Sequence, residues 1–163
     1  GIKRQAGDAA LTKKVIEQMA ALNQTAAELM LKHGAHAATD ITGYGLLGHA
    51  FEMADASGVG FELLADKLPV LPEAIELAGR GMNPGGANDN RAFLEGRLKI
   101  EDDIDPNLVQ VMYDPQTSGG LLIAVTPERA DRLSSDLSKA GLPSEAIGRA
   151  VEPGAVALTV RTN

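Results

Sequence analysis

The segment from Thr39 to His49 contains the residues best suited to chemistry. Gly43, Gly45 and Gly48 form a Gly-x-Gly-x-x-Gly pattern between a predicted strand and a predicted helix, and Glu62 follows after the next predicted strand. In a dinucleotide-binding fold, such glycines let the backbone approach a pyrophosphate, and the acidic residue binds a ribose. The pattern is therefore compatible with a stand-alone nucleotide- or dinucleotide-binding module.

Asp40 favours a different use of the same segment. Its carboxylate precedes Gly43 and would stand beside a bound pyrophosphate, where two anions at close range repel each other. A divalent cation between them removes the conflict, because Mg²⁺ commonly binds one or two carboxylates together with phosphate oxygens. We therefore predict that Asp40 is a metal ligand and that Thr39, Gly43 and Gly45 contact phosphate. The alternative is that Asp40 caps the next helix and the glycines only form a turn.

A second glycine motif, Asp-Pro-Gln-Thr-Ser-Gly-Gly, occupies residues 114–120 and precedes an apolar run. The hydroxyls of Thr117 and Ser118 and the backbone N–H groups of Gly119 and Gly120 are candidates for phosphate binding. An ordinary turn, begun by Asp-Pro and completed by the glycines, is the alternative. A third segment, residues 81–90, is rich in Gly and Asn and is predicted to be a loop whose Asn side chains could contact a ligand.

Three other polar groups have simpler interpretations. His33 and His36 are spaced like weak metal ligands, but without neighbouring carboxylate or Cys partners we interpret them as surface residues. His49 either belongs to the site or is a structural hydrogen-bonding residue. The acidic segment 101–105 lacks the Gly and the distal Glu of an EF-hand loop. Asp105 is instead predicted to cap a helix that begins at Pro106.

The apolar spacing predicts interleaved helices and strands. Helices are expected over residues 8–33 (one helix or a pair), 46–56, 73–78, 91–95, 106–112 and 127–140. Strands are expected over residues 36–39, 59–64, 121–125, 146–151 and 155–160, the last two as a closing hairpin. This order favours an α/β (α+β) domain in which helices pack on a four- to five-stranded mixed sheet.

The composition excludes several function classes. The 163 residues include 15 Lys and Arg, 22 Asp and Glu and no Cys, which gives a formal net charge of −7. This acidic balance argues against nucleic-acid and anionic-membrane partners, and the lack of Cys excludes a thiolate nucleophile in these residues. Without a long apolar segment or a run like a signal peptide, we expect a cytoplasmic protein. The first residue is Gly rather than Met, so we expect a fragment or a processed product.

Taken together, the three loops resemble the C-terminal part of selenophosphate synthetase (selenide, water dikinase), in the aminoimidazole-ribonucleotide-synthetase superfamily. The resemblance is carried by Thr39–His49, by Asp114–Leu122 and by Pro84-Gly85-Gly86 with Asn90-Arg91-Ala92. The order of the motifs agrees, and the resemblance extends over essentially the whole chain. Tyr44 stands where Phe is usual in the family.

This resemblance implies a Mg²⁺-dependent reaction in which selenide, ATP and water give selenophosphate, AMP and phosphate. The family fold has an N-terminal domain that binds ATP and dimerises, and a C-terminal α/β domain that closes over the phosphates. Residues 1–163 correspond to a single domain of the second kind, so the implied partners are its own N-terminal domain and a second subunit. The family's catalytic Cys or selenocysteine, its Lys and most of its metal-binding Asp residues belong to the N-terminal part. We therefore expect no catalytic residue here, Asp40 as the one metal ligand, and no turnover by this chain alone.

Overall fold

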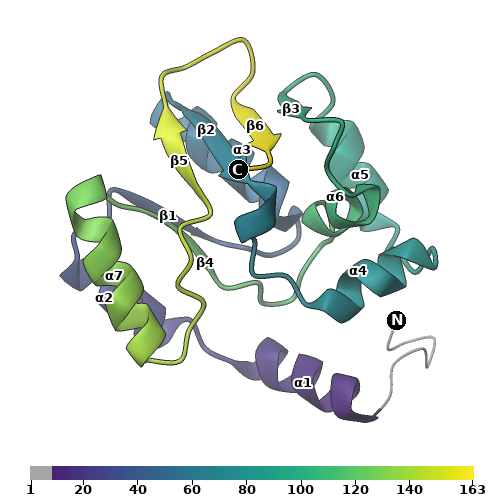
Figure 1. Ribbon diagram of the computed structural model, residues 1–163, viewed down its shortest axis with the longest axis horizontal. Coiled ribbons are helices and arrows are strands. Elements are labelled where there is room, and N and C mark those ends of the chain that lie inside the picture. The colour runs from purple at the N-terminus through teal and green to yellow at the C-terminus, as the bar shows by residue number, and fades with distance from the viewer. Residues whose placement is uncertain (1–8) are drawn as a thin grey trace.

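The fold contains two sheets, described for residues 9–163 by a computed structural model (Figure 1). Strands β1 (Ala37–Asp40) and β4 (Leu121–Ala124) pair antiparallel as a small sheet. The larger sheet has the order β3-β6-β2-β5, in which β2 pairs parallel with β6 and antiparallel with β5, and β3 pairs parallel with β6. Its strands are β2 (Gly60–Leu64), β3 (Leu98–Ile100), β5 (Gly148–Val151) and β6 (Leu158–Arg161). The expected α/β class with a four-stranded mixed sheet is confirmed.

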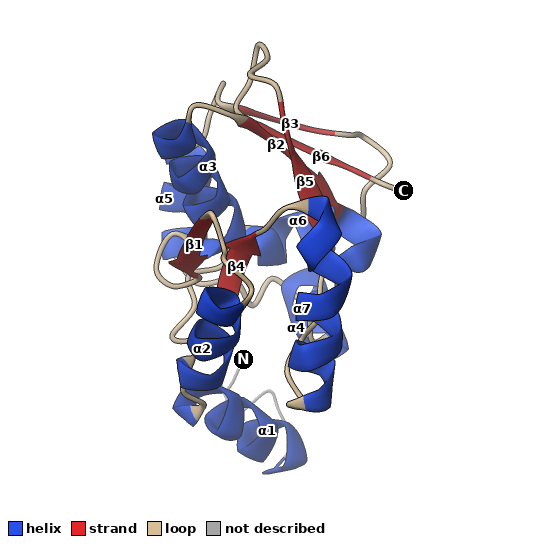
Figure 2. Cartoon of the chain, turned by 90° about the vertical axis from the view of Figure 1, so that its left-hand side faces the viewer, coloured by secondary structure: helices blue, strands red, loops and turns tan. Residues whose placement is uncertain are grey.

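Helix α3 (Gly45–Ser57) connects the two sheets, because it contacts β1 of the small sheet and β2 and β6 of the larger one. Figure 2 shows the four-stranded sheet at one end of the molecule and α1 and α2 at the other, with β1 and β4 between them. The remaining helices are α1 (Ala9–Ala20), α2 (Gln24–Lys32), α4 (Pro72–Gly79), α5 (Gly86–Phe93), α6 (Pro106–Met112), α7 (Pro127–Lys139) and the short 3₁₀ helix η2 (Ala65–Lys67).

The hydrophobic core lies between α3 and the larger sheet. Leu47 and Ala50 of α3 are completely buried, as are Leu158 and Val160 of β6. Burial of such aliphatic side chains contributes about 25 cal/mol for each Å² removed from water, which makes this layer the main support of both sheets. Neither α1 nor α2 contributes a buried residue to it. Among residues 9–163 there is no helix with the length and apolar character that crossing a bilayer would require.

Several predicted elements are correct. The segment 8–33 contains two helices over its described residues, and the helices predicted at 46–56, 73–78, 106–112 and 127–140 are present within a few residues of their expected ends. Position 8 lies outside the described residues. The expected cap of α6 is confirmed, since the backbone N–H of Asn107 donates to Oδ1 of Asp105 at 2.8 Å.

Two predictions about elements are wrong, and one strand was not predicted. Residues 155–160 do not form a hairpin with 146–151, because β5 and β6 each pair with an opposite edge of β2. Segment 81–90 is not entirely loop, because α5 begins at Gly86. Ala87 and Asn90 of α5, and Leu94 directly after it, follow helical spacing and are buried, and this burial outweighs the weak helix propensity of Gly and Asn. Finally, the three-residue strand β3 was not expected.

Candidate functional site

The first and second glycine motifs lie side by side. The register of β1 and β4 places Asp40 opposite Leu121. The pairing continues past the strand ends, because the N–H of Ile41 donates to the carbonyl of Gly120 at 2.9 Å and the N–H of Gly119 donates to the carbonyl of Ile41 at 2.8 Å. The predicted metal ligand is thereby fixed within a few residues of the predicted phosphate-binding glycines.

The two hydroxyl residues of the second motif project from this ladder. The backbone N–H of Gln116 donates to the carbonyl of Thr42 at 2.9 Å, so Thr117 and Ser118 form a short loop between the hydrogen-bonded residues Gln116 and Gly119. Thr117 is exposed and Ser118 is half-buried. Asp40 is exposed at the end of β1, and the preceding Thr39 is half-buried. The structure therefore brings the backbones of the two predicted motifs together at the ends of β1 and β4.

The glycines of the two motifs differ in whether the surrounding structure leaves room for a side chain. Gly45 has φ of +68° and is buried, and a Cβ there would lie 2.9 Å from the carbonyl carbon of Tyr113 and 3.0 Å from the oxygen of Asp114. A Cβ at Gly119 would lie 2.9 Å from Cβ of Ile41. Both glycines therefore allow the two motifs to pack closely. Gly43 is exposed, and a Cβ there would have no atom within 4 Å. A Cβ at Gly120, where φ is +84°, would likewise have no atom within 4 Å, so Gly43 and Gly120 leave open space for a ligand.

Asn90 connects the third motif to the other two. Its side chain is 6% exposed, and Nδ2 donates to the carbonyl of Gly43 at 3.0 Å and to the carbonyl of Tyr113 at 2.9 Å. The Gly43 carbonyl belongs to the first motif, and Tyr113 immediately precedes the second. The sequence analysis placed Asn90 in a loop whose Asn side chains could contact a ligand, and did not predict that it lies in a helix and joins the other two motifs. The helical spacing of Ala87, Asn90 and Leu94 was the signal that could have identified it.

His49 also holds the first motif. Its buried ring places Nε2 3.1 Å from Oγ1 of Thr42 and 3.4 Å from the backbone N of Tyr44, and Nδ1 3.3 Å from Oε2 of Glu52. A backbone N–H can only donate, so Nε2 is the acceptor and the ring proton of the neutral imidazole is on Nδ1, facing the carboxylate. This geometry favours the structural interpretation of His49 over a direct role in the site.

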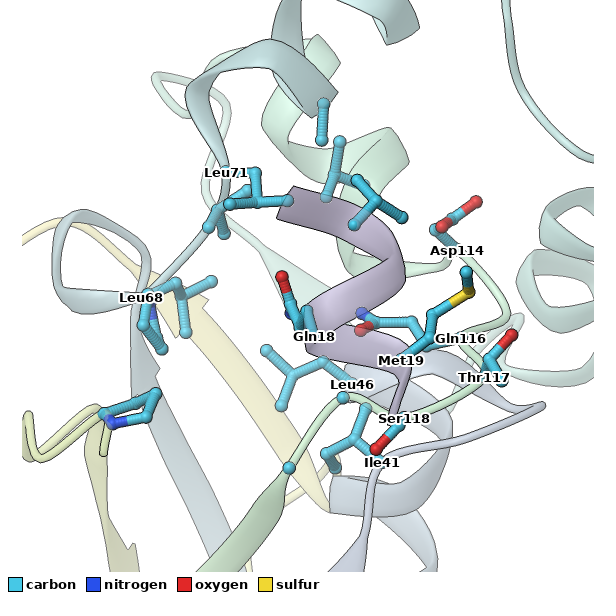
Figure 3. A pocket seen from close by; sticks show the side chains of 18 of the residues that line it. Gln18, Met19, Ile41, Leu46, Leu68, Leu71, Asp114, Gln116, Thr117 and Ser118 are labelled. Carbon is cyan, nitrogen blue, oxygen red and sulfur yellow. The ribbon is translucent and has the colours of Figure 1, made fainter. Parts of the chain in front are cut away.

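A cavity of about 830 Å³ lies against the second motif (Figure 3). Thr117 and Ser118 lie on the polar part of its wall, and Met19, Leu46 and Leu68 contribute apolar wall. No Lys, Arg or His is found among the described residues that line it, and Asp40 is not one of them either. Burial raises the pKa of the Asp114 carboxyl in this wall. The cavity therefore has no fixed positive charge for a phosphate, and it is separate from the Asp40 carboxylate.

The described residues offer a metal ion few ligands. Over residues 9–163 there is no group of three or more His, Asp or Glu side chains that could enclose a metal ion. A single exposed carboxylate fits Mg²⁺ nevertheless, since this ion keeps several waters and binds one or two carboxylates plus substrate phosphates. The prediction that His33 is a surface residue is wrong: it is half-buried, and its Nε2 lies within hydrogen-bond distance, 3.0 Å, of Oδ2 of Asp136 on α7.

The geometry does not support the dinucleotide-binding interpretation. That fold requires adjacent parallel strands on either side of the first helix, whereas β1 and β2 lie in different sheets. Glu62, the expected ribose ligand, lies 3.0 Å from Nε of Arg149 and 3.1 Å from Nη2 of Arg161. The hydrogen bond from Arg161, with further help from Arg149, lowers the pKa of Glu62. Its carboxylate is therefore part of a cross-strand ion cluster.

Comparison with known proteins agrees with the motif resemblance. The chain is 48% identical over 126 residues to a selenide, water dikinase of Caldanaerobacter subterraneus, which covers 76% of this chain and 36% of that protein. It is 44% identical over 143 residues to a selenide, water dikinase of Pelobacter propionicus, an alignment that covers 87% of this chain and 41% of that protein. It is 40% identical over 151 residues to one of Clostridioides difficile, where the alignment covers 92% of this chain and 43% of that protein. The chain thus spans about two fifths of the length of these curated relatives.

The fold is also found in a solved structure. A thiamine-monophosphate kinase from Stenotrophomonas maltophilia superposes with a TM-score of 0.50 at 24% identity, over 77% of this chain and 31% of that one. This likeness concerns the fold alone. A family described as "AIR synthase related protein, C-terminal domain" matches residues 2–161. With this match over nearly its whole length, the chain belongs to the C-terminal domain family of AIR synthase related proteins.

Proposed function

We propose that this chain is the C-terminal domain of a selenide, water dikinase, which converts selenide, ATP and water to selenophosphate, AMP and phosphate. One observation carries the proposal: Asp40 ends a strand that is hydrogen-bonded, through Ile41, to Gly119 and Gly120 of the second motif. The backbone that carries this carboxylate is thus paired with the backbone of the hydroxyl- and glycine-containing loop. The relatives named selenide, water dikinase support the choice of reaction.

In this proposal the residues of the chain bind and orient phosphates. Asp40 holds Mg²⁺, and the exposed backbone at Gly43 lets a phosphate oxygen approach. The hydroxyls of Thr39, Thr117 and Ser118 and the backbone N–H of Gly120 contribute further hydrogen bonds. The N–H of Gly119, also predicted to bind phosphate, is instead donated to the carbonyl of Ile41. When bound, Mg²⁺ supplies neutralisation of phosphate charge, which together with alignment is the main requirement of phosphoryl transfer.

The proposal assigns the rest of the chemistry to other parts of the protein. An N-terminal domain and a second subunit would bind ATP, supply the remaining carboxylates and provide the catalytic Cys or selenocysteine and Lys. The greater length of the relatives supports this division. The isolated chain is therefore expected to show no turnover, and the complete enzyme is expected to act in the cytoplasm, where ATP is available.

The proposal is tested by Asp40→Ala and Asp40→Asn in the longer polypeptide that carries this domain, with the exposed Asp102→Ala as control. Selenide-dependent formation of AMP and phosphate is measured together with the circular dichroism spectrum. We expect both Asp40 variants to lose this activity while they remain folded, and Asp102→Ala to retain it. Near-normal turnover by Asp40→Asn would overturn the metal-binding role.

A further inference from the structure

Three segments that are far apart in sequence meet at the side chain of Asn90. Both of its amide hydrogens are used, one on the carbonyl of Gly43 and one on the carbonyl of Tyr113. The side chain is buried, so water does not substitute for these bonds in the native state. Asn90 itself belongs to α5, which belongs neither to the small sheet nor to the two motifs that it joins.

The two bonded carbonyls, of Gly43 and Tyr113, lie outside the segment in which backbone hydrogen bonds of Ile41 and Thr42 join the two motifs. Toward Asp40, the motifs are already fixed by the backbone bonds of Ile41 and Thr42. Beyond Thr42 the first motif continues through the exposed Gly43, where a Cβ would meet no neighbouring atom. The Asn90 amide is thus the polar contact that orients the Gly43 carbonyl, and with it the peptide group that follows.

We infer that Asn90 is a positioning residue that sets the separation and orientation of the two phosphate-binding motifs, an inference that rests on the function proposed above. An amide is suited to this task because its NH₂ group has two donors in one plane. Aspartate has the same shape but would place a carboxylate oxygen against two carbonyl oxygens. Alanine would leave both carbonyls without their buried partner.

The test compares Asn90→Ala with Asn88→Ala in the longer polypeptide. Asn88 lies on the same helix but is exposed, so it is a matched control. The measured quantities are the Mg²⁺ concentration that gives half-maximal selenide-dependent AMP formation and the turnover per folded molecule. We expect Asn90→Ala to raise the half-maximal Mg²⁺ concentration by about tenfold, the factor that corresponds to the net contribution of one hydrogen bond. Asn88→Ala should leave it unchanged. A Mg²⁺ dependence of folded Asn90→Ala equal to wild type would overturn the inference.

A second measurement does not depend on the folding of a variant. In the wild-type polypeptide, the side-chain amide NMR signals of Asn90 should shift when Mg²⁺ and a non-hydrolysable ATP analogue bind, and those of Asn88 should not. Unchanged Asn90 signals on saturation with the analogue would contradict the inference. An active Asp40→Asn would refute the proposed function, whereas an inactive Asp40→Asn with a normal Asn90→Ala would refute only the positioning role.

Discussion

Replacement of Gly45 by alanine will strongly destabilise the junction between the two glycine motifs. The backbone at Gly45 is left-handed, with φ of +68°, which costs a residue with a Cβ about 1–2 kcal/mol. The new Cβ would lie 2.9–3.0 Å from backbone atoms of Tyr113, Asp114 and Met112, which have no side-chain freedom with which to yield. Overpacking of this kind costs about 1–3 kcal/mol, so we expect a total on the order of 3 kcal/mol.

Gly43→Ala is the matched control, because it makes the same change in the same motif at a position with open space and no positive φ. It should alter the free energy of unfolding by less than about 0.5 kcal/mol. For a chain of this size, Gly45→Ala should lower the melting temperature by about 6–12 °C. Urea and thermal unfolding followed by circular dichroism measure both variants. Equal and small effects at the two positions would refute the argument that Gly45 is required for packing.

Three further predictions concern the supporting structure. Leu47→Ala should cost about 2–5 kcal/mol in chemical denaturation because Leu47 is completely buried, whereas Leu22→Ala, at a side chain that is 79% exposed, should cost almost nothing. Asp105→Ala should cost about 1 kcal/mol by the same method because it removes the cap of α6, and a negligible loss would contradict the cap. Hydrogen bonds, mainly from Lys32 and secondly from His33, hold the pKa of Asp136 below its ordinary value of 3.8. The ionised Asp136 carboxylate therefore stabilises the fold fully above pH 3.8, and this stabilisation is lost as the pH falls toward the folded-state pKa. Melting temperatures recorded between about pH 6 and pH 2 should therefore fall less in Asp136→Asn than in wild type, and parallel curves would exclude this contribution.

The elements predicted most accurately from sequence are those whose pattern is local. The stripe of Leu47, Phe51 and Ala54 fixes the inward face of α3, and Asp105-Pro106 fixes the beginning of α6. Each depends on residues within one or two helical turns of each other, so no knowledge of distant segments is needed.

The failures concern partners that are distant in sequence. An apolar strand near Val160 was predicted, but nothing in its own residues shows that it pairs in parallel with β2 instead of antiparallel with β5. Likewise, Asn90 looks like a loop residue until the carbonyls of Gly43 and Tyr113 are placed beside it. The adjacency of the two glycine motifs follows from the pairing of β1 with β4, which no local pattern specifies.

The proposed role of Asp40, to hold Mg²⁺ against the phosphates of a nucleotide, is open to isothermal titration of the longer polypeptide with a non-hydrolysable ATP analogue. The titration is done with and without Mg²⁺, in wild type and in Asp40→Asn. We expect Mg²⁺ to strengthen binding to wild type, and Asp40→Asn to lose most of this strengthening while its Mg²⁺-free affinity is retained. Equal strengthening by Mg²⁺ in the two proteins would rule out this role.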